Sequence, residues 1–403
     1  MNNQIALAIK VVSVVLMAFS AWTVVGQIRK NPDCQTRTHE KYRWIWVALA
    51  AVLGRAVILL IGLWALDAGS AKDMWTRWDA VHYTTIVEQG YTADQSTQAW
   101  LNIVFFPLYP LLCKLLGGSF WAMLAVSWSC LAGASVLIDR ACPKEGRLWA
   151  QLWLHLVPAA VFLGAPYTES LFLLTTGLTL TMVKKRKWLW AGLCGMMAAL
   201  TRNLGVLTAL AFVVEYLMMH REQAARGETT WKKLIPAIVK GGGLWCALIP
   251  LGTVLYLLLN YAVYGDPFIF LQIQKDHWSQ SFGFFGQTLV TSLDYAINYN
   301  EWLYQICLFI PQTVMMVVTL VTLPFLLRKM SAAEAVYSLA YVICCMSPTW
   351  LLSYPRYLMG LAPLYPALAR AVRPLWARIL LTVVFLAIMA PLTICYLKGW
   401  PVL

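Results

Sequence analysis

Apolar runs recur along the whole of this 403-residue chain, and most come close to the roughly 20 residues that a helix needs to cross a bilayer. Inside a bilayer the backbone polar groups are satisfied only within helices or closed barrels, and these runs are too long for barrel strands. Hydrophobic residues make up 60% of the chain and charged residues 12%. The sequence therefore predicts an all-α polytopic membrane protein and excludes a soluble fold.

The apolar runs predict about twelve transmembrane helices in a single domain over residues 1–403. Three of the predicted segments are shorter than a full span, so we expect them to be tilted, broken or extended by their neighbours. The predicted spans are 5–26, 44–66, 119–138, 148–165, 168–183, 188–201, 203–219, 236–260, 302–327, 332–352, 357–372 and 375–397.

Short clusters of Lys and Arg separate the apolar runs and indicate the orientation of the chain, because basic loops stay in the cytoplasm. If residues 29–43 lie inside, the inside loops hold 21 of the 31 Lys and Arg residues and the outside loops hold seven. The net charge of +13 is then a signal of membrane topology, and it does not indicate a nucleic-acid partner. We expect a multi-pass protein of the cell membrane.

This orientation requires that residues 101–118 do not cross the membrane. Pro107 and Pro110 interrupt the first turns of that segment, so we predict an interfacial helix there. Two large external loops result, at 67–118 and 261–301, and ten of the 18 acidic residues lie outside. Acidic and basic side chains therefore meet at the outer interface, where the polar head group of a lipid substrate would lie.

The first external loop contains the stretch RWDAVHY, which concentrates polar side chains among aromatic ones. In a helix Asp79, His82 and Tyr83 share one face, because they stand three and four positions apart. A partly desolvated carboxylate can take a proton from a sugar hydroxyl, and a histidine can orient a ligand or donate to a phosphate. The stretch can equally be a helix start with aromatic anchoring, and the spacing leaves both interpretations open.

Three further motifs place charged side chains where helices meet the outer face. GAPYTESLF puts Glu169 at the start of an apolar helix, where Thr168 can also serve simply as an N-cap. ALTRNLG and SYPRYL place Arg202 and Arg356 at outer breaks between apolar segments. At those breaks an arginine can pair with a lipid phosphate or extend to the interface.

Other polar positions have weaker support from the sequence. In the second external loop, Asp266 lies in an ordinary GDP turn, and His277 fits a structural role as well as a ligand contact. Arg55 and Glu215 lie within apolar spans, and the sequence does not show whether they pair. The ten cysteines are scattered without a CxxC pair, so neither a disulfide framework nor a zinc site is predicted.

In this order and with this spacing, RWDAVHY, FFPLYPLL, PAAVFLGAPYTESLF and ALTRNLG resemble the motifs of the GPI mannosyltransferase 2 (PIG-V) family and its prokaryotic relatives. The resemblance is strong over residues 75–215, and YGDPFIFLQ and SPTWLLSYPRYL extend it towards the prokaryotic members. It implies a GT-C fold, a catalytic Asp in the first external loop and a polyprenyl-phosphate sugar as donor. After the arginine the family tends to have Ser-Asn-Gly, whereas Asn203, Leu204 and Gly205 follow Arg202 here. The loops are shorter than in eukaryotic members, which implies an acceptor other than a GPI precursor.

By this resemblance Asp79 takes the position of the catalytic carboxylate. The residues assigned to the phosphate of the donor are Arg77, His82, Arg202 and Arg356. The residues assigned to other substrate contacts are Trp78, Tyr83, Tyr167, Glu169, Asn203, His277 and Tyr354.

The expected activity is the transfer, with inversion, of a hexose such as mannose from polyprenyl phosphate to a hydroxyl of a glycan, lipid or protein acceptor on the extracytoplasmic side. No cofactor is required, because a lipid phosphate leaves without a diphosphate clamp. A divalent cation between Asp79 and Glu169 stays an alternative that a chelator would reveal. The alternative function is a transporter or flippase, with Arg55, Glu215 and Lys240 along its pathway, although no internal repeat supports it. A non-catalytic lipid-binding subunit is a third interpretation, and it would tolerate the loss of Asp79.

Overall fold

The computed structural model describes residues 2–30, 40–65 and 70–402, and in this part of the chain the regular structure is helical apart from one isolated β-bridge. Two predicted loops lie partly outside the described residues: positions 31–39 of the basic loop 29–43, and positions 67–69 of the first external loop. The structure confirms the predicted all-α class.

Seven helical segments in the described residues are long and apolar enough to cross a membrane. They contain α1 (Asn3–Lys30), α2 (Arg43–Ala65), α6 (Phe120–Ala141), α10 (Thr208–Ala225), α12 (Leu248–Tyr264), α16 (Ile310–Leu327) and α20 (Leu375–Leu397). The structure thus confirms a polytopic membrane protein, but length and composition identify fewer full spans than the predicted twelve.

Shorter elements form the other five predicted spans. They are α7 (Arg147–Leu156), η3 (Ala160–Leu163), α8 (Glu169–Lys184), α9 (Trp188–Thr201), α17 (Ala332–Met346), α18 (Tyr354–Met359) and α19 (Leu364–Ala371). Helix α8 packs against α6, α9 and α10, and its buried Thr175, Thr176 and Thr179 donate to carbonyl groups of the preceding turn. A helix that protein encloses in this way does not have to match the thickness of the hydrocarbon layer.

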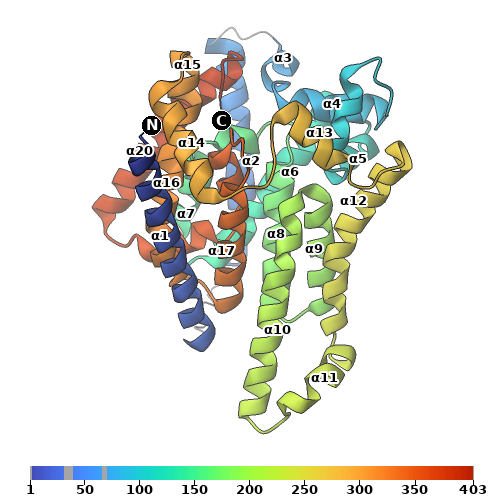
Figure 1. Ribbon diagram of the computed structural model, residues 1–403, viewed down its shortest axis with the longest axis vertical. Helices are drawn as coiled ribbons and strands as arrows, with labels where there is room; N and C mark the ends of the chain where they lie inside the picture. Colours follow the sequence, from blue (N-terminus) through green and yellow to red (C-terminus); the bar gives the residue numbers. More distant parts are fainter. Residues whose placement is uncertain (1, 31–39, 66–69, 403) are drawn as a thin grey trace.

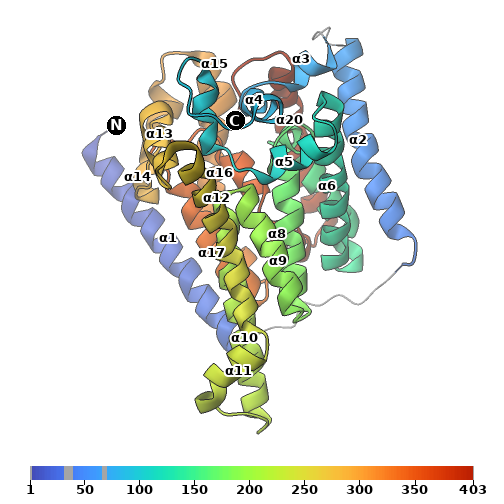
Figure 2. The same cartoon turned by 90° about the vertical axis from the view of Figure 1, so that its right-hand side faces the viewer.

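The two predicted external loops lie at the same end of the helix bundle, which we call the loop end (Figures 1 and 2). The first loop forms α3 (Ala71–Trp75), α4 (Asp79–Gln89), η1 (Gln98–Val104) and α5 (Leu108–Leu115), and the second forms α13 (Ile269–Trp278) and α14 (Phe285–Asn298). Helix α5 has only eight residues and begins after Pro107. The structure therefore confirms that residues 101–118 do not form a spanning helix.

Basic side chains join the loops at the other end of the bundle. Arg370 donates to the carbonyl oxygens of Lys329, at 3.1 Å, and of Ala141, at 2.7 Å. Arg378 donates to the carbonyl oxygen of Glu145 at 3.0 Å. The loops that hold these residues therefore share one end of the bundle, as the distribution of Lys and Arg predicts.

Arg55 of α2 and Glu215 of α10 do not pair with each other. Arg55 is buried, and its guanidinium donates to the carbonyl oxygens of Ala160, at 2.8 Å, and of His155, at 3.2 Å. It thereby satisfies the carbonyl group of His155 at the carboxyl end of α7, where a positive charge is favourable, and that of Ala160 at the start of η3. Glu215 forms an ion pair with Arg186, with 3.3 Å between Oε1 and Nε. Each of the two charges thus has partners of its own.

Gly252 brings α12 close to α9, the helix that carries Arg202 at its end. A Cβ atom on Gly252 would lie 2.4 Å from the backbone oxygen of Met196, so Gly252→Ala should push the helices apart. We expect the variant to lose about 1–3 kcal/mol of stability, measured by thermal unfolding in detergent. Gly54→Ala is the matched control, because a Cβ there meets nothing within 4 Å. Equal melting temperatures for the two variants would contradict this close packing.

Candidate active site

The turn before α4 presents Asp79 at the loop end. Trp78 is the N-cap of α4 with φ 53° and ψ −125°, and its side chain makes no capping hydrogen bond. A positive φ is unusual for a bulky residue and costs on the order of 1–3 kcal/mol. The hydroxyl of Tyr167 donates to the carbonyl oxygen of Arg77 at 2.8 Å and secures the turn. Asp79 is therefore the first residue of a helix and follows a strained turn, which confirms the helix-start interpretation of the stretch.

Glu169 is the first residue of α8. Thr168 occupies the N-cap position without a capping hydrogen bond, and its Oγ1 lies 3.4 Å from the hydroxyl of Tyr83 instead. Ser170 donates to the carbonyl oxygen of Leu163 at 2.6 Å and closes the turn. The side chain of Glu169 is only 1% exposed. A carboxylate at this depth requires cationic partners.

Two arginines approach Glu169 from helix ends. Arg202 follows α9 in an extended conformation, before η4 (Asn203–Leu207). Arg356 lies in α18, a helix that Gln312 of α16 holds by accepting from the backbone N–H of Tyr354 at 3.3 Å and donating to the carbonyl oxygen of Leu351. Both arginines thus lie at breaks between apolar segments, as the sequence predicts.

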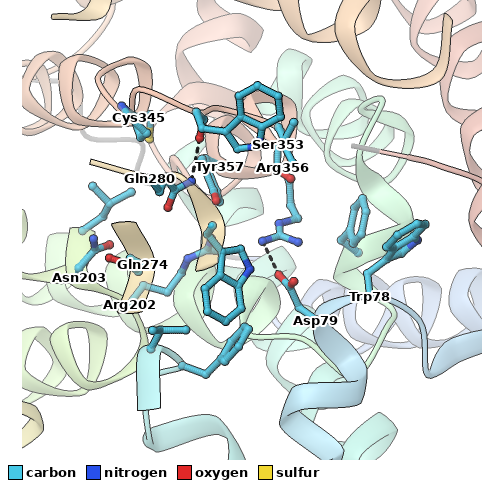
Figure 3. A pocket seen from close by; sticks show the side chains of 18 of the residues that line it. Trp78, Asp79, Arg202, Asn203, Gln274, Gln280, Cys345, Ser353, Arg356 and Tyr357 are labelled. Carbon is cyan, nitrogen blue, oxygen red and sulfur yellow. Dashed lines mark hydrogen bonds and ion pairs between the residues drawn. The ribbon is translucent and has the colours of Figure 1, made fainter. Parts of the chain in front are cut away.

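Four side chains from distant parts of the chain form an alternating row of charges, which we call the charged cluster. Nη2 of Arg356 lies 2.7 Å from Oδ2 of Asp79, and its Nε lies 3.0 Å from Oε1 of Glu169. Nη1 of Arg202 donates to the same Oε1 at 2.7 Å. Figure 3 shows Arg356 extending towards Asp79. Exposure is 27% for Asp79 and 1% for Glu169, so Asp79 is the carboxylate that a substrate can reach.

Aromatic rings pack on both guanidinium groups of the charged cluster. Arg356 lies 5.4 Å from the ring centre of Tyr167 and 5.5 Å from that of Tyr357. Arg202 lies 5.0 Å from the ring centre of Tyr357. These contacts stabilise the cations through the negative faces of the rings, and they restrict both side chains.

The environment fixes the protonation of two groups at this site. Burial lowers the pKa of Arg356, but the carboxylates of Asp79 and Glu169 raise it by more, so its pKa lies well above the ordinary value. For Tyr83, burial has the opposite effect and raises the pKa of the hydroxyl, and the negative charge of Glu169 raises it further. At neutral pH the arginine is charged, and the tyrosine hydroxyl keeps its proton.

A cavity of about 390 Å³ lies over the charged cluster. A volume of this size is typical of sites for small molecules. Apolar and aromatic side chains form much of its wall, among them Phe105, Phe162 and Leu308. The predicted site residues that line it are Trp78, Asp79, Tyr83, Arg202, Asn203 and Arg356.

The second external loop closes one side of this cavity with residues that the motifs do not single out. They are Gln274, Trp278 and Gln280. Two backbone hydrogen bonds hold the loop in place: Gly283 donates to Ser347 and Thr349 to Ser281, both at 2.8 Å. The sequence does hold one sign of this arrangement. Gln274 and Trp278 stand four positions apart, so on a helix they share one face and can line the same cavity.

Arg77 and His82, which the resemblance assigns to the donor phosphate, do not line the cavity. The guanidinium of Arg77 lies against Gly399 near the end of the chain. Nδ1 of His82 lies 2.7 Å from Oδ1 of Asn102, and its ring stacks on Phe105 at 4.7 Å between centres. Of the predicted shared face of α4, Asp79 and Tyr83 thus line the cavity, whereas His82 points to η1.

Four residues assigned to substrate contacts also lie outside the wall of the cavity. His277 is exposed and meets the edge of Trp100, and Tyr354 is buried in the core. Tyr167 and Glu169 are buried beneath the cavity and contact Arg356. They support the arginine and are not exposed to a substrate.

The sequence left open a divalent cation that bridges Asp79 and Glu169. In the structure the guanidinium of Arg356 lies between these two carboxylates. Across residues 2–30, 40–65 and 70–402, no three His, Cys, Asp or Glu side chains are grouped so that they could hold a metal ion.

The fold and the cavity together define an all-helical polytopic membrane protein with a charged site at one end of its bundle. Among curated proteins the chain is similar to GPI alpha-1,6-mannosyltransferase 2 of Mus musculus, with 26% identity over 209 residues. The match covers 47% of this chain and 40% of the mouse protein, which is less than half of that protein's length. It supports a relationship to a PIG-V-like family of glycosyltransferases. No family model and no solved structure matches.

Proposed function

We propose that this protein is an inverting glycosyltransferase that moves a hexose, in the first instance mannose, from polyprenyl phosphate to an acceptor hydroxyl on the extracytoplasmic side. The charged cluster beneath the cavity carries this proposal, because it combines one accessible carboxylate with two arginines. The similarity to a mannosyltransferase supports glycosyl transfer in general. The distribution of Lys and Arg supports an extracytoplasmic position for the loop end.

Arg202 and Arg356 bind the phosphodiester of the donor in this proposal. Among the described residues the side chain of Arg202 donates only to Glu169, and only through Nη1, so its other N–H groups can bind an anion. Charge-assisted hydrogen bonds from arginine to phosphate are among the strongest polar contacts. The apolar lining, which includes Leu204, Leu308 and Val402, supports a donor whose isoprenoid chain starts at the cavity and continues into the bilayer.

Asp79 acts as the general base. It accepts the proton of the acceptor hydroxyl as the hydroxyl oxygen bonds to the anomeric carbon. The bond between that carbon and the phosphate oxygen breaks, and polyprenyl phosphate leaves with the electron pair. The two arginines stabilise the charge that develops on the leaving phosphate. A single displacement of this kind inverts the anomeric configuration.

A transfer assay tests the proposed function. The purified protein in liposomes would receive radiolabelled polyprenyl-phosphate mannose together with glycolipid, glycan and hydroxyl-bearing peptide acceptors. We expect the label to move to one class of acceptor with inverted configuration. The absence of transfer to every class, with or without binding of the donor, would overturn the proposal.

Arg202→Lys should raise the KM for the donor by about 10- to 100-fold, because lysine keeps the charge but loses the planar fork that matches a phosphate. The value of kcat should fall as well, because the guanidinium also stabilises the charge that develops on the leaving phosphate. Initial rates at varied donor concentration would measure both constants. Arg226→Lys is the control, because Arg226 is 63% exposed and lies outside the cavity. An unchanged KM for Arg202→Lys would refute the phosphate contact.

A further inference from the structure

Two buried cysteine thiols that are 88 residues apart in the sequence contact each other. Cys307 lies in the π-helical turn η7 (Gln305–Phe309), and Cys395 lies in the last turns of α20. Their sulfur atoms are 3.6 Å apart, and the two residues are 6% and 8% exposed. A disulfide has sulfur atoms about 2.05 Å apart, so these two sulfur atoms would have to approach by about 1.5 Å to bond.

Both thiols lie at similar depth, near the loop end. Trp302 and Trp400 are 67% and 46% exposed, and each stands five positions from one of the two cysteines. Exposed tryptophans of this kind mark the interface between membrane and water. Cys307 follows Trp302 within a single helical stretch, and Trp400 follows the end of α20 at Leu397, so both thiols lie within a few residues of that interface.

Each of the two cysteines lies next to a chain segment that lines the cavity over the charged cluster. Leu308 follows Cys307 directly and lines the cavity. The segment after α20 contributes Pro401 and Val402 to the same cavity. A covalent bond between the cysteines would therefore fix these two lining segments relative to each other.

We propose that Cys307 and Cys395 form a disulfide in the mature protein. This inference rests on the proposed function in one respect, namely that the loop end faces the extracytoplasmic side, where disulfides form and persist. The oxidant is a protein thiol oxidase that carries a reactive disulfide. One cysteine thiolate attacks that disulfide, which forms a mixed disulfide and releases one oxidase thiolate. The second cysteine thiolate then attacks the sulfur of the first cysteine in the mixed disulfide and displaces the other oxidase thiolate. The two thiols lose two protons and two electrons, and the oxidase disulfide is reduced to a dithiol.

Counting of thiols in the denatured protein tests the disulfide. Cells would be quenched with acid, and their membranes would be dissolved in SDS. One sample would be labelled with a maleimide polymer directly, and a second sample would be reduced before it is labelled. We expect the wild type, which has ten cysteines, to take two more labels after reduction. Cys307→Ser and Cys395→Ser should each abolish that difference. Cys142→Ser is the matched control, since Cys142 is a buried cysteine at the far end of α6, and it should keep the difference.

Equal labelling of the wild type with and without reductant would overturn the disulfide, as would a difference that persists in Cys307→Ser. The transfer assay separates this result from the proposed function. A chain without the bond that still transfers sugar would refute only the disulfide. A chain with the bond that transfers nothing to any acceptor would refute only the glycosyltransferase.

Discussion

Asp79→Asn is expected to lower kcat for sugar transfer by about 10²- to 10⁴-fold, the range that general-base catalysis contributes. Asparagine has nearly the same size as aspartate and can still accept a hydrogen bond from Arg356, but it cannot take a proton from the acceptor. Binding of the donor should persist, because Arg202 and its partner Glu169 are unchanged. Initial rates of transfer at saturating donor would measure the effect.

Asp94→Asn is the control for this prediction. Asp94 lies in the same external loop and is exposed, and its carboxylate accepts hydrogen bonds from Ser96 rather than from the charged cluster. Its replacement should leave kcat unchanged. Full turnover by Asp79→Asn would rule out the general-base role and would favour a protein that binds the lipid donor without reacting.

Glu169→Gln is expected to destabilise the protein by about 3–5 kcal/mol. Glu169 is 1% exposed and pairs with Arg202 at 2.7 Å and with Arg356 at 3.0 Å. Removal of one member of a buried ion pair leaves an uncompensated charge in the interior, and here two arginines would share that loss. Thermal unfolding in detergent would measure the change, with the fraction of protein that stays monodisperse at each temperature as the readout.

Glu88→Gln provides the comparison for a carboxylate of the same loop end. Glu88 contacts Lys72 at 4.0 Å, and both side chains are more than half exposed. Solvent screens such a pair, so its loss should change the stability by less than about 1 kcal/mol. If both glutamine variants unfold at the wild-type temperature, the charged cluster does not support the fold.

The long apolar runs were sufficient to predict the class of the fold and the seven full-length spans. The short elements were harder, because α8 is enclosed by other helices and does not need the length that lipid imposes. The breaks between α7 and η3 and between α18 and α19 depend on packing around the site. Such packing leaves little trace in hydropathy.

The sequence also predicted which charged residues meet, but not how they meet. Asp79, Glu169, Arg202 and Arg356 were expected at one interface, and the structure brings them into contact. That Arg356 stands between the two carboxylates depends on the position of α18, which the distant Gln312 sets. Contacts of this kind join parts of the chain that local spacing cannot relate.

The backbone at Trp78 has a consequence for the selection of variants. Glycine tolerates a positive φ, so glycine at position 78 would relieve the backbone while removing an indole ring from the wall of the cavity. Screens for heat resistance and screens for sugar transfer would therefore favour different amino acids at this one position, and a laboratory-evolved thermostable form would be expected to bind its substrates less tightly.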